Sequence, residues 1–432
     1  MKKKLLSIIL AGAMSLSLVA CGSGQTSDVN AVKDDPNKEQ TITVWAWDPN
    51  FNIAVMNEAK AIYEKANPNI KIEIVDFAKA DVEQKLHTIL AAQTKKDLPE
   101  IVLIEDYNAQ KYLQSYPGAF EELTDKIPYD KFADYKKGYM TVEGKSYGVP
   151  FDSGVTGYYY RTDILEQAGF KPEDLNNITW DRFIEIGKVV KEKTGKPMLS
   201  TDPSDLGLLR VMLNGAGTWY CDEDGNPYFS NNDAMKEGLG VMKTLIDTGV
   251  SAKHSGWADF LKSFNSGSVA GVPTGIWITA SIKQEASQSG LWRVAPIPRL
   301  NATGAINASN LGGSSWYVLA ESASKDAAIK FLKDSYTNEE FYQTALEKIG
   351  AVGTYIPSMD GEAYTKPEEF FGGQTIYSDM SKWMKEVPQV NTGMYTYEAE
   401  AILSAGFNDI LNGKSIDEVL KSVEEQVKNQ IK

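Results

Sequence analysis

The sequence predicts an α/β protein with two lobes, each built on a sheet covered by helices. Two observations predict this class: strand-like and helix-like segments alternate after residue 40, and about 390 residues follow an export signal and its tether, which exceeds one ordinary domain. The alternation β-α-β-α-β favours a parallel sheet with right-handed crossovers and helices on both faces.

The N-terminus has the pattern of a secretion signal. Residues 1–4 are basic, an apolar stretch runs to Ala20, and Leu18-Val19-Ala20-Cys21 resembles the bacterial lipobox, in which the cysteine is acylated. We therefore expect a signal peptide at 1–20 and a lipidated, palmitate-bearing Cys21 that begins a flexible tether through residue 39. The protein would be extracytoplasmic, anchored on the outer face of the cell membrane of a Gram-positive bacterium.

The first lobe can be followed segment by segment. Residues 41–47 alternate like a strand, 53–66 have helical spacing, 70–74 alternate again, 82–90 are helical, and 101–104 form a short apolar strand. Ligands of such sheets bind beyond the carboxyl ends of the strands. We therefore expect the ligand cleft near the residues that follow these three strands.

The rest of the chain is expected to alternate between the lobes. The predicted elements are a hairpin at 142–145, a crossing between lobes at 149–153, a helix at 179–190 capped by Thr179, a strand at 271–277 returning to the first lobe, a helix at 324–332 capped by Ser324, and a surface helix at 415–431. The predicted N-terminal lobe comprises 40–150 plus 275–333. The predicted C-terminal lobe comprises 151–274 plus 334–432.

The composition restricts the partners. A net charge of −14 argues against nucleic acid, because phosphate contacts need a basic patch. The chain has 9 Trp and 21 Tyr but only two His, and it has no P-loop motif for nucleotide phosphates. We expect no cofactor, no metal site and a monomer. With Cys21 lipidated, Cys221 would be a lone thiol.

Several short motifs resemble the extracellular solute-binding proteins of family 1, the maltose-binding-protein-like receptors of carbohydrate ABC importers. These motifs are Thr43-Val44-Trp45, Leu98-Pro99-Glu100-Ile101-Val102, Tyr147-Gly148-Val149-Pro150, Thr179-Trp180-Asp181, Gly275-Ile276-Trp277, Gly312-Gly313-Ser314-Ser315-Trp316, and Asn412-Gly413-Lys414-Ser415-Ile416. The resemblance implies a type II periplasmic-binding-protein fold, in which hinged lobes close like a Venus flytrap on a ligand cleft. It also implies membrane permease partners with a separate ATPase.

A sugar offers C–H faces that stack on aromatic rings and hydroxyls that pair with planar polar groups. The resemblance places Trp47, Asp106, Trp219, Trp277, the segment Gly313 to Trp316 and Tyr395 along the ligand groove. Asp152 at the predicted crossing, Tyr355 and Trp383 are further candidates from the residues alone. The alternatives are core packing for the rings, a helix cap for Asp106 and a tight turn for Gly313. We expect an oligosaccharide receptor that is not an enzyme.

Two other functions use similar residues. A glycoside hydrolase could employ Glu105 and Asp106, but adjacent residues at a strand end face opposite ways and cannot flank one glycosidic bond. A ferric-ion receptor could employ the phenols of Tyr158, Tyr159 and Tyr160, although this triplet also has the pattern of a plain strand.

Overall fold

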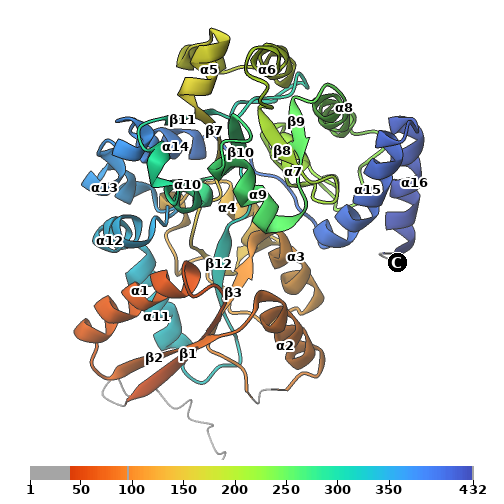
Figure 1. The fold of residues 1–432 in the computed structure, drawn as a ribbon. Helices are drawn as coiled ribbons and strands as arrows, with labels where there is room; N and C mark the ends of the chain where they lie inside the picture. The colour runs from red at the N-terminus through yellow and green to blue at the C-terminus, as the bar shows by residue number, and fades with distance from the viewer. Residues whose placement is uncertain (1–38, 95–96, 431–432) are drawn as a thin grey trace, which may run out of the picture. The chain divides into compact units, whose positions relative to one another are not determined.

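The computed structural model describes residues 39–94 and 97–430. Its largest sheet has the strand order β2-β1-β3-β12-β6 (Figure 1). The strands are β1 (Gln40–Ala46), β2 (Ile70–Asp76), β3 (Ile101–Glu105), β6 (Gly148–Pro150) and β12 (Ser314–Val318). Strand β1 runs parallel to β2 and β3, and β12 runs antiparallel to β3 and β6. The predicted parallel β-α-β-α-β unit is confirmed.

Helices cover both faces of this sheet. Helix α1 (Asn52–Ala66) packs on α11 (Lys325–Tyr336), which contacts β1, β6 and β12, whereas α2 (Lys79–Ala91) and α3 (Asp106–Ser115) lie on the other side (Figure 1). The first crossover runs from β1 to β2 and the second runs back from β2 past β1 to β3, so right-handed connections place their helices on opposite faces. Helix α11 forms as expected, but its Ser324 side chain makes no capping hydrogen bond.

A second sheet has the order β10-β7-β11, with all pairings antiparallel. Its strands are β7 (Thr156–Arg161), β10 (Gly271–Gly275) and β11 (Trp292–Pro296). Strand β10, which forms within the predicted strand at 271–277, pairs with β7 and not with a strand of the first sheet; its place in the N-terminal lobe stays a prediction. An added Cβ on Gly271 would lie 2.3 Å from the Tyr159 carbonyl oxygen, so glycine permits this close pairing with β7. The chain returns to the first sheet later, at strand β12. The lobe boundaries stay a prediction.

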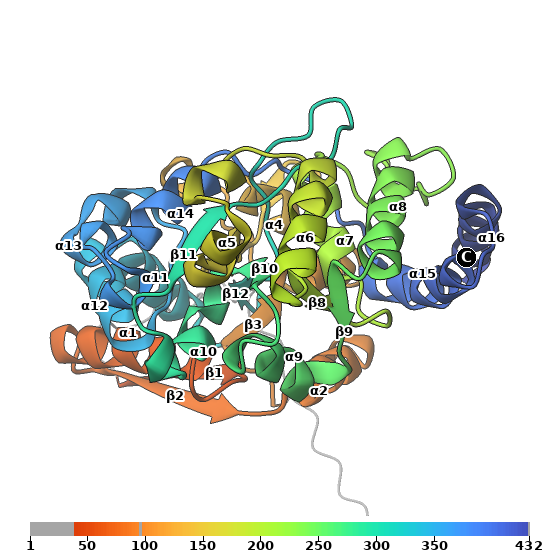
Figure 2. The same ribbon diagram turned by 45° about the horizontal axis from the view of Figure 1, so that its top comes forward.

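Shorter strands and helices complete the described residues (Figure 2). The remaining strands are the hairpin β4 (Thr141–Val142) and β5 (Lys145–Ser146) and the parallel pair β8 (Leu199–Thr201) and β9 (Ser251–Lys253). The remaining α-helices are α4 (Lys136–Met140), α5 (Thr162–Ala168), α6 (Trp180–Thr194), α7 (Gly207–Gly215), α8 (Asp233–Asp247), α9 (Gly256–Asn265), α10 (Thr279–Lys283), α12 (Glu339–Ile349), α13 (Glu362–Thr365), α14 (Ile376–Met384), α15 (Thr396–Leu411) and α16 (Ile416–Gln430). The 3-10 helices are Tyr129–Lys131, Pro172–Leu175, Ile276–Ile278, Ala286–Gln288, Ile356–Asp360 and Glu369–Phe371.

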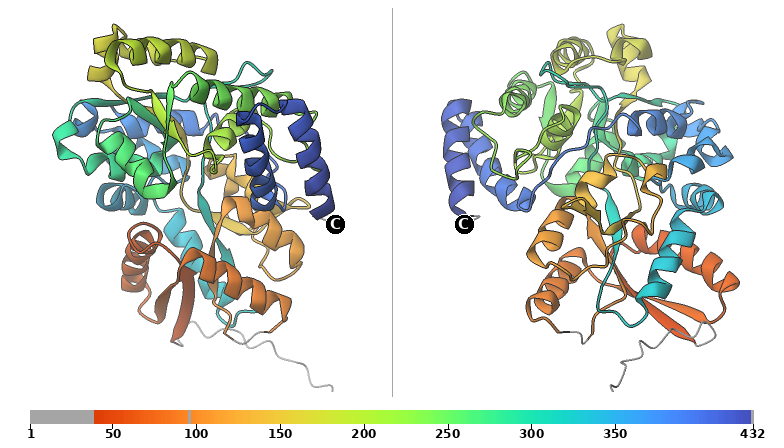
Figure 3. Two further views of the ribbon diagram at one scale, coloured as in Figure 1. Left: turned by 45° about the vertical axis from the view of Figure 1, so that its right-hand side comes forward. Right: turned by 180° about the vertical axis from the view of Figure 1, so that it is seen from behind.

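Two predicted helix patterns show how the sequence sets these elements. The Thr179 hydroxyl accepts a hydrogen bond from the Arg182 amide at 3.3 Å and caps α6. In α16, the valines at 419, 423 and 427 are buried. This face packs against α15 and α8, and α15 and α16 lie side by side in every view (Figure 3). Both predictions are confirmed.

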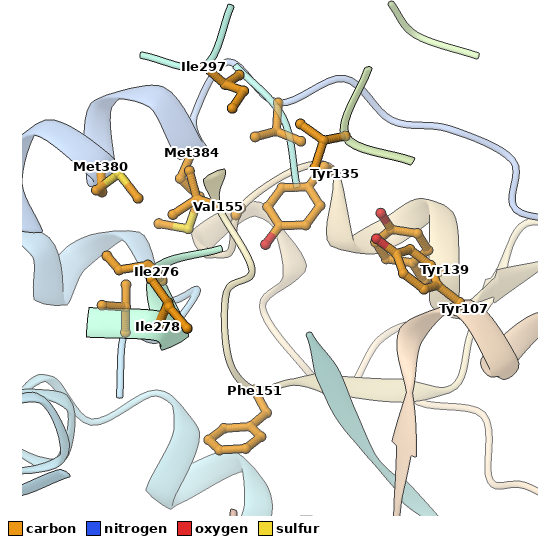
Figure 4. Packing of buried hydrophobic residues seen from close by; sticks show 14 of the residues in the cluster. Tyr107, Tyr135, Tyr139, Phe151, Val155, Ile276, Ile278, Ile297, Met380 and Met384 are labelled. Carbon is orange, nitrogen blue, oxygen red and sulfur yellow. The ribbon is translucent and has the colours of Figure 1, made fainter. Parts of the chain in front are cut away.

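Aromatic side chains fill much of the core. Phe151 follows β6 and packs against Trp316 and Tyr336, with ring centroids 5.5 Å and 5.8 Å away. The Tyr107 and Tyr139 rings meet edge to face at 5.9 Å (Figure 4). These contacts join β12, α3, α4 and α11 around the segment where the chain leaves the first sheet.

Candidate functional site

A cavity lies at the carboxyl ends of the parallel strands β8 and β9. Asp202 directly follows β8, and His254 directly follows β9. Its volume is about 220 Å³, and residues at the end of β10 and in the first turn of α9 also line it. We call it the Trp277 pocket, and its lining residues are Ser200, Thr201, Asp202, Asp205, Gly207, Leu208, His254, Gly256, Trp257, Phe260, Pro273, Thr274, Trp277 and Leu311.

Two indole rings form one wall of the Trp277 pocket. Trp257 and Trp277 have ring centroids 5.9 Å apart and planes inclined by 38°. The Trp277 Nε1 donates a hydrogen bond to the Leu311 carbonyl at 3.0 Å, which fixes the ring. An added Cβ on Gly275 would lie 2.2 Å from this Nε1, so the glycine two residues before Trp277 makes room for the ring. The wall therefore offers aromatic surface on which a sugar can stack.

Polar groups also line the pocket. Burial by itself would raise the pKa of Asp202, but hydrogen bonds from Ser204 and the Gly256 amide lower this pKa below its ordinary value. Asp202 is therefore a carboxylate acceptor at neutral pH. Burial lowers the pKa of His254, whose Nδ1 lies 3.0 Å from the Ser200 hydroxyl, and the imidazole is neutral. The lining therefore combines a carboxylate with uncharged donors and acceptors.

A buried ionic network adjoins the pocket. The Arg210 Nε lies 3.2 Å from Glu400, and the guanidinium lies over the Tyr107 and Tyr397 rings at 5.5 and 5.7 Å. Arg210 also reaches Asp205 of the pocket at 3.4 Å. A second connection runs through Gly312, whose amide donates to the Tyr107 hydroxyl at 3.0 Å.

The same network brings α15 to the end of β3. The Tyr397 hydroxyl donates a hydrogen bond to the Glu105 carboxylate at 2.7 Å, and Glu105 also pairs with Lys79. Glu105 is the last residue of β3 and Tyr397 lies in the first turn of α15. The end of β3 and the start of α15 are therefore connected to the Trp277 pocket through Arg210 and Asp205.

Asp106 and Asp152 hold the backbone together and have little exposure to solvent. Lys136 donates hydrogen bonds to the Asp106 carboxylate at 2.6 Å and to the Asp152 and Ser314 carbonyls at 3.2 and 2.9 Å. The Asp152 carboxylate accepts the Ser314 amide at 2.6 Å. Asp106 and Lys136 are both 0% exposed. We call Asp106, Lys136, Asp152 and Ser314 the crossing cluster, and its carboxylates are not among the ligand contacts that we propose.

Several predicted ring positions are also buried. Trp219 packs on Tyr107 at 5.1 Å and its indole nitrogen donates to Thr396. Trp316 lies between Phe151 and Tyr336, and Tyr355 stacks on Tyr342. Their packing partners occupy the faces that a sugar would need, which favours core packing over ligand contact for these three rings.

The other predicted positions lie elsewhere. Trp47 and Trp383 are half-buried and pack against the core. Gly313 has φ +100°, and an added Cβ would meet the Asp106 carboxylate at 2.8 Å, so its glycine serves the backbone. Tyr395 lines a separate cavity of about 820 Å³ between the end of α3, the hairpin and residues 223–225 and 389–395. That cavity is larger, but it does not lie at the strand ends where Asp202, His254 and Trp277 converge.

Of these lining residues, Trp277 is among the predicted ligand contacts, whereas Asp202, Asp205, His254 and Trp257 are not. The sequence patterns predict no strand between the helix at 179–190 and residue 271, so the three-residue strands β8 and β9 were not predicted. The available signal is Leu199-Ser200-Thr201 followed by Asp202-Pro203, a short segment that ends in a turn dipeptide. Strands this short have too few residues to establish an alternating pattern.

Comparison with known proteins gives a consistent result. The family model described as bacterial extracellular solute-binding protein matches residues 58–372. The chain belongs to this family. It is 52% identical over 391 residues to the lactose-binding protein of Rhizobium radiobacter, and the match covers 90% of this chain and 93% of that protein.

More distant relatives agree with this assignment. The arabinooligosaccharide-binding protein of Halalkalibacterium halodurans is 24% identical over 93% of this chain and 92% of its own length. The sugar-binding protein MalE of Xanthomonas citri has a TM-score of 0.77 at 18% identity, covering 90% of this chain and 97% of that one. The predicted family and the type II periplasmic-binding-protein fold are confirmed. The family is extracellular, and no helix in residues 39–94 and 97–430 has the length and apolar character of a membrane span.

Proposed function

We propose that this protein is the sugar-binding receptor of an ABC importer and that its ligand is a small oligosaccharide. The observation that carries the proposal is that two tryptophan rings and the Asp202 carboxylate line one pocket at strand ends, which suits a ligand with C–H faces and hydroxyl edges. The 52% identity to a lactose-binding protein supports a β-galactoside disaccharide, so lactose is the first ligand to test.

The proposed contacts follow from the geometry. Trp277 stacks on one sugar ring, because its hydrogen bond to Leu311 holds the indole in place at the pocket wall. Asp202 accepts hydroxyl protons as a carboxylate, and His254 can donate or accept as a neutral ring. The Asp205 side chain is 67% exposed and lines the pocket, so it can also accept hydrogen bonds from sugar hydroxyls.

We propose that the sugar is bound without being transformed. Glu105 faces Lys79 and Tyr397, while its neighbour Asp106 faces inward to Lys136 and Ser315. Two carboxyl groups that point in opposite directions cannot act on one glycosidic bond. An iron site at Tyr158 and Tyr160 is disfavoured for a different reason. Burial raises the pKa of Tyr158 well above its ordinary value, and its hydroxyl donates to the Met198 carbonyl, so this phenol keeps the proton that an iron ligand must lose.

The receptor would work by closure. Sugar that contacts both sides of the cleft favours the closed form, and the closed form presents the sugar to the membrane permeases, whose ATPase is a separate subunit. Acylation of Cys21, which lies outside the described residues, would hold the receptor at the membrane. The hydrogen bond between Glu105 and Tyr397, which joins the two predicted lobes beside the aromatic pair, supports closure.

Thermal-shift and calorimetric titrations with lactose, its two monosaccharides and a panel of other disaccharides test the proposal. A ligand that binds only the folded state raises the melting temperature with concentration. We expect a shift with at least one disaccharide and its loss in Trp277→Ala, while Trp383→Ala, a half-buried tryptophan outside the pocket lining, keeps the shift. A flat response across the panel contradicts sugar binding, and release of monosaccharides from lactose contradicts a pure receptor.

A further inference from the structure

Trp257 is unusually exposed for its size. It is 55% exposed, and Ile62 at 38% is the other large hydrophobic residue of the described part of the chain that exceeds a third. Phe260 and Trp277 pack beside the Trp257 ring, with centroids 5.4 and 5.9 Å away. Because Trp257 also lines the Trp277 pocket, its exposed surface can contact a ligand that enters the pocket.

The position of Trp257 is built into the backbone. Gly256 has φ +69°, and its amide donates a hydrogen bond to the Asp202 carboxylate at 3.0 Å. This bond ties the first turn of α9 to the end of β8, and it fixes the start of the helix that carries Trp257. The ring is therefore presented at the rim of the Trp277 pocket by a tethered helix and not by a free loop.

The size of the pocket suggests different roles for Trp277, which lies inside it, and Trp257, which lies at its edge. The cavity measures about 220 Å³, which is below the roughly 300 Å³ at which typical small-ligand pockets begin. In this conformation a disaccharide would extend beyond the cavity and over its rim. Trp277 is half-buried inside the pocket, whereas Trp257 is exposed at its edge, with a ring plane inclined by 38° to that of Trp277.

We infer that Trp257 is a specificity-determining residue that stacks on the second sugar unit and makes the receptor prefer disaccharides or longer oligosaccharides to monosaccharides. This inference rests on the proposed function, since it requires that the Trp277 pocket binds the first sugar unit. Trp277 and Asp202 then bind one unit in the pocket, and only a ligand with a second unit gains the contact with Trp257.

Calorimetric titration of wild type, Trp257→Ala and Trp257→Phe tests the inference, with lactose and methyl β-galactoside as probes. We expect Trp257→Ala to weaken lactose binding by about tenfold or more, because it removes one stacking face. Trp257→Phe keeps an aromatic face and should stay within about threefold of wild type. The methyl glycoside, measured directly or by competition with lactose, should bind wild type and Trp257→Ala within about twofold of each other.

A second measurement distinguishes contact from a structural role. Lactose should shield tryptophan fluorescence from acrylamide in wild type, and most of this protection should be absent in Trp257→Phe. The unliganded melting temperatures should match, since the side chain is more than half exposed. Equal losses for both probes in Trp257→Ala, unchanged lactose affinity, or unchanged protection in Trp257→Phe overturns the inference while sugar binding by wild type stands. Failure of wild type to bind any sugar overturns the proposed function instead.

Discussion

Replacing Lys136 by Met should destabilise the folded state strongly. The substitution keeps a similar side-chain volume but removes the ammonium group that donates to the Asp106 carboxylate and to the Asp152 and Ser314 carbonyls. Both side chains of the Lys136–Asp106 pair are 0% exposed, so water cannot replace the lost hydrogen bonds. A buried charge left without its partner costs about 3–5 kcal/mol, which is our expected loss in the free energy of unfolding.

The neighbouring lysine provides a matched control. Lys137 pairs with Asp134 at 2.6 Å, but the side chains are 37% and 67% exposed, and exposed ion pairs contribute about 1 kcal/mol or less. Urea unfolding followed by circular dichroism at pH 7 should therefore separate Lys136→Met from Lys137→Met by several kcal/mol. The double variant Lys136→Met with Asp106→Leu should recover much of the loss, because it also removes the unpaired charge.

The dependence of the Lys136→Met defect on pH follows from the carboxyl group. Burial raises the pKa of Asp106 above its ordinary value, and loss of Lys136 raises it further. The folded state then holds a proton that the unfolded chain has released, so the defect is full above the raised pKa and shrinks as the pH falls through it toward about 4. Equal unfolding free energies for the two single variants at pH 7 would refute the importance of the crossing cluster.

Three further outcomes are expected. Trp277→Ala should weaken sugar binding by about 1–3 kcal/mol in calorimetry through loss of one stacked face, and an affinity equal to that of Trp383→Ala would make Trp277 a packing residue. Burial raises the pKa of Asp152 to about 6, so the stability that Asp152 contributes should fall as the pH rises from about 4 through about 6 and level off above; the difference in unfolding free energy between wild type and Asp152→Asn in urea titrations should show this fall, and a flat or rising difference would contradict it. Cys21→Ser should abolish palmitate labelling and release the receptor from the membrane fraction, and unchanged labelling would exclude acylation at this residue.

The fold was predictable where local patterns are long. Residues 41–47 and 70–74 alternate, and the helix at 53–66 repeats its apolar residues with helical spacing, so these patterns alone predict a parallel β-α-β-α-β unit. The destination of residues 271–277 could not be deduced in this way. Sheet membership depends on the close approach of Gly271 to Tyr159, and such tertiary contacts leave no periodic signal in the sequence.

The site was predictable only in part, because residue type does not distinguish an exposed ring from a buried one. Trp219, Trp277 and Trp316 follow comparable glycine-containing segments, yet only Trp277 lines the pocket at the strand ends. The difference arises from neighbours supplied by distant segments, such as Tyr107 over Trp219 and Tyr336 beside Trp316. Chemistry suited to a sugar was therefore easier to recognise than the side chains that present it.

The two carboxylates at the end of β3 show how one strand end can serve both stability and function. Glu105 is the last residue of β3 and reaches Tyr397 of α15, whereas Asp106 is the first residue of α3 and turns inward to Lys136 and Ser315. The inward residue connects β3 to β12 and to the crossing segment, and the outward residue meets the network beside the Trp277 pocket. Mutating Asp106 should therefore act through stability, and mutating Glu105 should alter ligand affinity with little change in the unfolding free energy.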